Sequence, residues 1–132
     1  MKILGLDLGD RHTGVAILDT SVPVSLPLPS IVNNRYFLKY LAGIIAAQSA
    51  TQIIIGLPLT LAGTDSPQTR KVRQMAEKIQ EVTGLPVSLE DERFTTRQAS
   101  ALLRSSTVHP AHHLDSVSAQ LILESWWTRQ NS

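Results

Sequence analysis

The first 18 residues contain two short apolar runs separated by a polar turn that begins and ends with glycine. Ile3–Leu8 and Val15–Leu18 are the apolar runs, and Gly9–Gly14 connects them. Two apolar runs joined by such a turn are typical of antiparallel strands. We therefore expect the chain to begin with a β-hairpin, so that any larger sheet has to be built around this hairpin.

Strand and helix patterns alternate after the hairpin. Val22–Ile31 combines alternating apolar residues with three prolines, which is typical of a weak strand at the margin of a sheet. Arg35–Ser49 has helical spacing, and the isoleucine-rich run Gln52–Leu57 has the pattern of a buried strand. The other expected elements are a helix from Ser66-Pro67 to Gly84, a strand at Pro86–Leu89, a helix from Thr95 through Leu103, a polar loop at Arg104–His113 and a last helix from about Leu114 to Thr128.

This order of elements predicts an α/β fold. Three antiparallel strands followed by parallel strands give a mixed five-stranded sheet, and the intervening helices flank it. The length of 132 residues fits one domain, residues 1–132, with a core of useful size.

Composition limits the chemistry that the protein can perform. The chain has no cysteine, which excludes disulfides, thiol nucleophiles and thiolate zinc sites, so a metal would have to bind oxygen or imidazole. Twelve Lys and Arg against eleven Asp and Glu give a net charge of +1, which neither requires nor excludes a nucleic-acid partner. The longest apolar run, Tyr40–Ala47, is too short to span a bilayer, and no leader pattern opens the chain. We expect a cytoplasmic protein without a membrane partner.

Asp7 is unusual because it lies inside an apolar strand, between Leu6 and Leu8. A carboxylate held among packed neighbours is costly unless a partner compensates it. Backbone amides of the glycine turn are one candidate partner, since a buried polar group needs only satisfied hydrogen bonds. A divalent metal is the other candidate, and it is the one that the remaining acids favour.

Further acids are expected to meet Asp7 where the carboxyl ends of the strands open into a crevice. Glu90, Asp91 and Glu92 fall just past the end of the last expected strand, but their positions alone do not select one of them. Asp115 is expected to point inward, because it begins a helical stripe that is otherwise apolar. That stripe continues with Ala119, Ile122 and Trp126.

Acids that converge on one poorly solvated rim repel one another and raise one another's pKa unless a cation joins them. Carboxylates without thiolates suit hard ions such as Mg²⁺ or Mn²⁺, and paired ions can activate water for phosphodiester cleavage. The acids therefore indicate metal-dependent nuclease chemistry. Taken singly they have structural explanations: Asp115 could complement its helix dipole, and residues 90–92 could form a solvated turn.

Four stretches together resemble the YqgF family, also called RuvX, over nearly the whole chain. They are "LGLDLGDRHTGVAILD" at the start, the glycine-proline loop "IIIGLPLTLAGTDS", the Asp-Glu-Arg-x-Thr-Thr signature in "LEDERFTTRQA", and the acidic helix "LDSVSAQLIL". The resemblance implies an RNase H-like fold with the first strand central to the sheet. It also implies a metal-dependent nuclease that processes the 5′ end of precursor 16S ribosomal RNA. Some members have instead been proposed to resolve four-way DNA (Holliday) junctions.

Carried over residue by residue, the resemblance makes Asp7, Glu92 and Asp115 the acids that hold Mg²⁺ or Mn²⁺, with Asp91 as a substitute or neighbour for Glu92. Arg93 would orient the phosphate or the developing charge. Basic residues of the family after the first motif appear here as Arg11 and His12, and His112 and His113 stand where relatives often have lysine or arginine. Histidine is not a permanent cation, which weakens the expected phosphate affinity at neutral pH.

Arginines near the acids are the expected nucleic-acid contacts. Arg11 lies in the first turn, and Arg93, Arg97 and Arg104 flank the acidic cluster, so their guanidinium groups could grip backbone phosphates. Surface pairing with nearby carboxylates is the alternative for Arg93 and Arg97.

Two other functions are compatible with the fold. One is nucleotide binding of the sugar-kinase and actin type, although those proteins use two lobes and this chain is long enough for one. The other is a catalytically silent module that binds ribosomal RNA. The sequence leaves open the choice of RNA or DNA, the cut position, endonuclease or exonuclease mode, and whether the protein is a monomer or a homodimer.

Overall fold

The computed structural model describes the backbone of residues 1–94 and 111–131 and the side chains of residues 1–93 and 116–131. Its centre is a five-stranded sheet in the order β3-β2-β1-β4-β5, with the first strand in the middle. The β1–β2 and β2–β3 pairs are antiparallel, whereas β1–β4 and β4–β5 are parallel. The strands are β1 (Lys2–Leu8), β2 (His12–Asp19), β3 (Val22–Val32), β4 (Ala50–Leu57) and β5 (Val87–Asp91). The predicted mixed five-stranded α/β sheet is confirmed.

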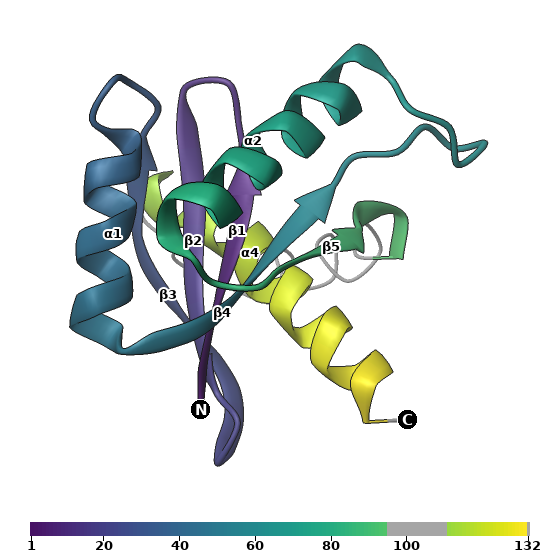
Figure 1. Ribbon diagram of the computed structural model, residues 1–132. Helices are drawn as coiled ribbons and strands as arrows, with labels where there is room; N and C mark the ends of the chain where they lie inside the picture. The colour runs from purple at the N-terminus through teal and green to yellow at the C-terminus, as the bar shows by residue number, and fades with distance from the viewer. Residues whose placement is uncertain (95–110, 132) are drawn as a thin grey trace.

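Helices cover both faces of this sheet. Figure 1 shows α1 (Phe37–Gln48) and α2 (Pro67–Thr83) in front of the sheet and α4 (Ala111–Gln130) behind it. A short 3₁₀ helix, η1 (Glu92–Phe94), follows β5 directly. None of the helices in the described part of the chain is long and apolar enough to cross a membrane.

The isoleucine run of β4 contributes to two hydrophobic cores, one on each face of the sheet. Ile53 and Ile55 pack in the cluster beneath α1 and α2, and Ile54 packs in the cluster beneath α4. Successive side chains of a strand point to opposite faces, so a strand covered on both sides reads as a continuous apolar run. The same alternation in β1 puts Leu4 and Leu6 on the α1 and α2 face and Ile3 on the α4 face.

Local signals place α2 accurately. The Ser66 side chain accepts a hydrogen bond from the Thr69 backbone N–H at the start of the helix, and Pro67 occupies its first turn. Gly84 ends it in the left-handed region with φ of 71°. A capping hydroxyl, an early proline and a final glycine satisfy the end groups of a helix, and this is why the sequence predicted both ends correctly.

Several predicted boundaries are wrong. Strand β2 begins at His12, so residues 12–14 of the predicted turn belong to the strand. Strand β5 extends through Asp91, so Glu90 and Asp91 lie inside the strand, opposite Gly56 and Leu57 of β4, and only Glu92 follows it. The last helix begins at Ala111, so residues 111–113 are helical and do not belong to the predicted polar loop. Proline is favoured at helix starts, and Pro110 directly precedes this helix in the sequence. The helix predicted at Thr95–Leu103 lies outside the described residues.

Hydrogen bonds attach α4 to the edge strand β3. The Ser116 hydroxyl donates to the Leu28 carbonyl oxygen of β3 at 2.6 Å, and the Gln120 amide donates to the Ser25 carbonyl oxygen at 3.2 Å. Ser25 in turn donates to a Glu124 carboxylate oxygen at 2.7 Å. These bonds fix the start of α4 over β2 and β3, which determines where the backbone of Asp115 lies.

Candidate active site

Asp7 and Glu92 meet at the carboxyl edge of the sheet. Asp7 lies near the end of β1 on the α4 face and is half-buried, and Glu92 is the first residue after β5. A side-chain hydrogen bond joins the two carboxyl groups. Burial, the negative charge of Asp7, this hydrogen bond and the charge of Asp91, in that order of size, raise the pKa of Glu92 to about 8.

Gly56 of β4 makes room for Glu92. A Cβ atom at Gly56 would lie 2.5 Å from Oε1 of Glu92 and 2.5 Å from Cδ1 of Ile122, which is closer than real Cβ atoms approach other groups. The absence of a side chain therefore lets the Glu92 carboxyl group lie across β4 towards β1. A glycine that interrupts an apolar strand often marks such a close approach, and this signal in the sequence was missed.

Glu90 is held in a separate structural cluster. Its side chain is only 4% exposed, and its carboxylate accepts hydrogen bonds from the Ser125 hydroxyl at 2.9 Å and the Arg129 guanidinium at 3.1 Å. These partners come from the second half of α4, so Glu90 anchors that helix to β5.

Asp91 is bound to Arg93. The guanidinium Nη2 of Arg93 lies 2.6 Å from Oδ2 of Asp91, and Nε and the backbone N–H of Arg93 donate to the same carboxylate at 2.9 to 3.1 Å. These hydrogen bonds and the positive charge hold the pKa of Asp91 below its usual value. Of the three acids between which sequence reasoning did not choose, Glu92 is the one that the fold brings to Asp7.

Arg93 also contacts the loop between β4 and α2. It donates a hydrogen bond to the Leu61 carbonyl oxygen at 3.3 Å, and a Cβ atom at Gly63 would lie 3.1 Å from its Nη1. Gly63 has φ of 81°, a conformation that glycine adopts without strain. The exposed guanidinium of Arg93 is thus held between Asp91 and the loop that joins β4 to α2.

Asp115 belongs to the first turns of α4, and its side chain lies outside the described part. The Val15 N–H donates to the hydroxyl of the next residue, Ser116, at 3.4 Å, and Val15 follows Gly14, the partner of Asp7 in the β1–β2 ladder. The backbone of Asp115 is therefore held over the end of β2 that adjoins Asp7. The stripe predicted from Asp115 is buried at Ala119 and Ile122.

The predicted phosphate contacts are described only in part. Arg11 is exposed in the turn between β1 and β2, where its carbonyl oxygen accepts a hydrogen bond from the Asn33 N–H at 2.8 Å. Arg97 and Arg104 lie outside the described residues.

The donor chemistry of the acidic pair fits a hard cation. The described side chains include no group of three or more metal-binding residues. Asp7 and Glu92 nevertheless supply oxygen ligands, and their mutual repulsion is the kind that Mg²⁺ or Mn²⁺ relieves. The space above Gly56, which a Cβ atom would fill, holds the Glu92 carboxyl group at the carboxyl edge of the sheet.

Comparisons with known proteins agree with the fold and identify the family of the chain. Residues 1–129 match the family RuvX, described as "Holliday junction resolvase". A protein of Chloroflexus aggregans named "Putative pre-16S rRNA nuclease" is 33% identical over 129 residues, covering 94% of this chain and 91% of the relative. A protein of the same name from Caldanaerobacter subterraneus subsp. tengcongensis is 33% identical and covers 100% of this chain and 99% of the relative.

Solved structures show the shared fold at low sequence identity. RuvC of Thermus thermophilus has a TM-score of 0.62 at 10% identity and covers 99% of this chain and 97% of its own. The fowlpox virus resolvase, solved with Holliday junction DNA, has a TM-score of 0.61 at 11% identity over the full length of both chains. The sheet is therefore of the RuvC-like, RNase H-like type.

Proposed function

Because the chain belongs to the RuvX family, we propose that it is a nuclease that hydrolyses phosphodiesters in structured nucleic acid with the aid of Mg²⁺ or Mn²⁺. The proposal is supported above all by the meeting of Asp7 and Glu92 at the edge of the sheet. Two carboxyl groups that repel each other in a half-buried place favour a cation as their joint partner. The same region includes an arginine and an exposed turn, which suit a phosphate backbone.

In this proposal each residue has a distinct role. Asp7, Glu92 and Asp115 would hold the metal, and Asp91 would keep Arg93 oriented. When bound, the metal would supply the Lewis acid that activates a water molecule and stabilises the leaving oxygen. Arg93 would bind a non-bridging phosphate oxygen and balance the charge that develops there. Arg11, Arg97 and Arg104 would hold flanking phosphates.

Precursor 16S ribosomal RNA is the proposed substrate, since the curated relatives are named "Putative pre-16S rRNA nuclease". Cleavage at its 5′ end is the finer part of this proposal and follows from the resemblance of the sequence motifs. A four-way DNA junction is the second candidate, because the family description and the solved resolvase complexes refer to junctions. We further propose that residues 1–132 form a single domain that acts in the cytoplasm as a monomer or homodimer.

Cleavage of a labelled precursor of 16S ribosomal RNA, with and without Mn²⁺, tests this function. We expect metal-dependent cleavage by the wild type and none by Asp7→Asn, whereas Asp19→Asn, an exposed site at the far end of β2, should cleave normally. A four-way DNA junction serves as the parallel substrate. Binding of the RNA without cleavage under any metal condition would instead indicate a silent RNA-binding module, and tight ATP binding without nuclease activity would indicate a nucleotide-binding protein.

A further inference from the structure

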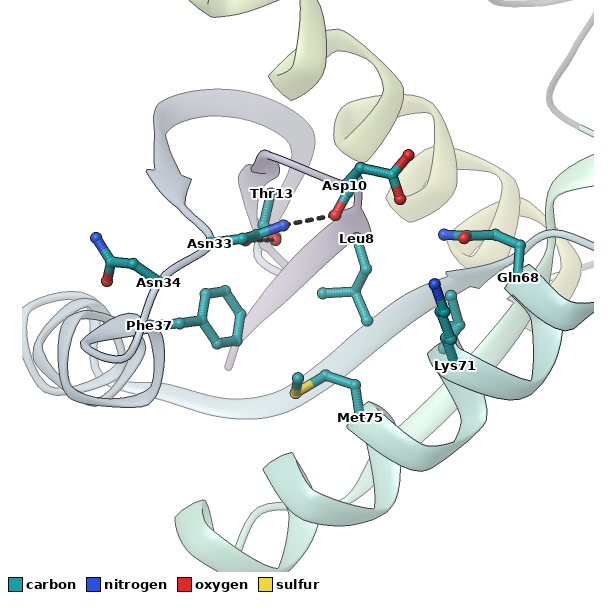
Figure 2. Close-up of a pocket in the computed structure, with 11 residues that line it drawn as sticks. Leu8, Asp10, Thr13, Asn33, Asn34, Phe37, Gln68, Lys71 and Met75 are labelled. Atoms are coloured by element: carbon teal, nitrogen blue, oxygen red, sulfur yellow. Dashed lines mark hydrogen bonds between the residues drawn. The ribbon is translucent and has the colours of Figure 1, made fainter.

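A cavity of about 360 Å³ opens at the end of β1 on the face of the sheet opposite Asp7 (Figure 2). Leu8, Phe37 and Met75 form its apolar wall, and they come from β1, α1 and α2 respectively. A volume of this size is within the range of sites that bind small organic molecules. An aromatic ring and a thioether together offer a surface on which a flat ring can pack.

The polar side of the cavity is nearly neutral. Asp10 and Lys71 contribute one charge of each sign, and Gln68 adds an amide group. Figure 2 shows Gln68 and Lys71 on the α2 side of the cavity, whereas the Asn34 side chain points away from it, and its oxygen accepts a hydrogen bond from the Tyr36 N–H at 2.8 Å. Amides offer both donors and acceptors, whereas a phosphate site would present several cations. This lining favours an uncharged heteroaromatic ring with donors and acceptors on its edge.

Hydrogen bonds hold one wall of the cavity in place. The Thr13 hydroxyl donates to the Asn33 side-chain oxygen at 2.7 Å, and the Asn33 amide donates to the Gly9 carbonyl oxygen at 2.5 Å. These bonds tie the turn between β1 and β2 to the end of β3. The cavity is therefore formed before any ligand binds, which lowers the entropic cost of binding.

The cavity adjoins the acidic site through the backbone of β1. Leu8 follows Asp7 directly, so their Cα atoms are about 3.8 Å apart while their side chains point to opposite faces. A nucleic-acid strand that places a phosphate beside Asp7 would pass over the turn that carries the exposed Arg11. The base of a neighbouring nucleotide could then turn into the cavity.

We propose that this cavity binds one unpaired nucleobase of the substrate strand, next to the nucleotide that is cut. The inference rests on the proposed nuclease function and extends it to the choice of substrate. Proteins read RNA sequence mostly in unpaired segments, where a base can be stacked on side chains and hydrogen-bonded along its edge. The cavity would give the enzyme a preference for one base at one unpaired position and would exclude a fully paired duplex at that position.

The two methionines of the chain provide a direct probe. Met75 lines the cavity, and Met1 is 65% exposed at the opposite end of β1. In protein labelled with ¹³C at the methionine methyl groups, free adenosine, guanosine, cytidine and uridine are titrated without metal. We expect at least one nucleoside to shift the Met75 signal in a saturable way and to leave Met1 unchanged. Absence of a Met75 shift with all four, or an equal shift with inorganic phosphate alone, would overturn the proposal.

Substitutions test whether the cavity contributes to substrate binding and base preference. Met75→Trp fills the cavity, and Gln74→Trp places the same bulk on an exposed neighbouring position of α2 as the control. Met75→Trp should raise KM for the cleaved RNA by about tenfold, the lower end of what a lost pocket contact costs, with kcat nearly unchanged. Gln68→Ala should weaken the nucleoside-induced Met75 shift and reduce the base preference. If it weakens the shift but cleavage keeps its KM and base preference, the cavity does not serve the substrate and the proposal fails.

The two proposals fail separately. The nucleoside titration needs neither metal nor cleavage, so a missing Met75 shift alongside Asp7-dependent cleavage would contradict only the nucleobase site. A saturable Met75 shift in a protein that cleaves nothing would contradict the nuclease and with it the role of the cavity in substrate choice.

Discussion

The carboxyl groups of Asp7 and Glu92 share a hydrogen bond, although Asp7 lies near the end of the central strand β1 and Glu92 follows the edge strand β5. The space between them is bridged by β4, which has Gly56 at this level. The lack of a side chain at Gly56 in β4 thus lets acids from the two neighbouring strands, β1 and β5, come together.

The raised pKa of Glu92 predicts how stability changes with pH in the absence of metal. The pKa of Glu92 is about 8 in the folded protein, against an ordinary value of 4.5. Protonated Glu92 therefore favours the folded state, and this contribution to stability is complete only below about pH 4.5. Its contribution is lost as pH rises from there through 8. We expect the Tm of the metal-free protein to fall over this range more steeply in the wild type than in Glu92→Gln, which cannot ionise.

Thermal unfolding across pH measures this effect, with Glu81→Gln on the exposed side of α2 as the control for loss of a carboxylate. Mn²⁺ should stabilise the wild type more at pH 8 than at pH 5, because binding requires the ionised form. Parallel Tm curves for wild type and Glu92→Gln would show that Glu92 does not titrate in this way.

Gly56→Ala tests whether the space at Gly56 is needed for the position of the Glu92 carboxyl group. The added methyl group would overlap Glu92 and Ile122, and overpacking of this kind costs about 1–3 kcal/mol of folding free energy. We expect lower stability in denaturant and weaker Mn²⁺ binding, because the Glu92 carboxyl group would be displaced.

Gly43→Ala is the matched control for this change. A Cβ atom at Gly43 meets nothing within 4 Å, and alanine in the middle of a helix stabilises by about 0.5–1 kcal/mol relative to glycine. If Gly56→Ala were as stable as Gly43→Ala and bound Mn²⁺ like the wild type, the close approach of Glu92 would be refuted.

Asp91→Asn tests whether Asp91 and Glu92, which are neighbours in sequence, have different functions. Asp91 is occupied by Arg93, so its neutralisation should leave Mn²⁺ affinity within about twofold of the wild type while it loosens Arg93. Cleavage should slow in Asp91→Asn through poorer phosphate contact. Calorimetric Mn²⁺ titration decides the point, and a large loss of affinity in Asp91→Asn would make Asp91 a ligand after all.

Arg11→Ala tests the path of the nucleic acid over the β1–β2 turn. Loss of one phosphate contact should weaken RNA binding for all sequences alike and reduce the slope of log affinity against log salt by roughly 1. Binding measured at several salt concentrations gives this slope. Lys78→Ala, exposed on α2, is the control for loss of one positive charge, and an equal slope change in both variants would place the RNA elsewhere.

Local patterns in the sequence were sufficient for most of the fold. The hairpin, the proline-rich edge strand β3 and the two ends of α2 depend on neighbours in sequence, and each is present as predicted, although β2 begins at His12 and not at Val15. The extent of β5 did not follow from local pattern, because Glu90 can lie inside a strand only with Ser125 and Arg129 of α4 as partners.

The candidate active site, like the fold, could be predicted from local sequence only in part. Asp7 was recognisable from the sequence because an acid between two leucines is unusual. The choice among Glu90, Asp91 and Glu92 needed the pairing of β5 with β4, which turns Glu90 towards α4 and frees Glu92 to reach across Gly56. The cavity was not predictable, since its walls come from β1, α1 and α2, and only tertiary packing brings them together.

Mn²⁺ binding by the three proposed acids is the measurement that tests the central claim most directly. Titration of the wild type, Asp7→Asn, Glu92→Gln and Asp115→Asn by calorimetry should show a loss of affinity of at least about tenfold in each variant, as expected for groups that share one ion. The variants should remain folded by circular dichroism. Wild-type affinity in a folded Asp7→Asn or Asp115→Asn would contradict the account, because that acid would then not belong to the metal site.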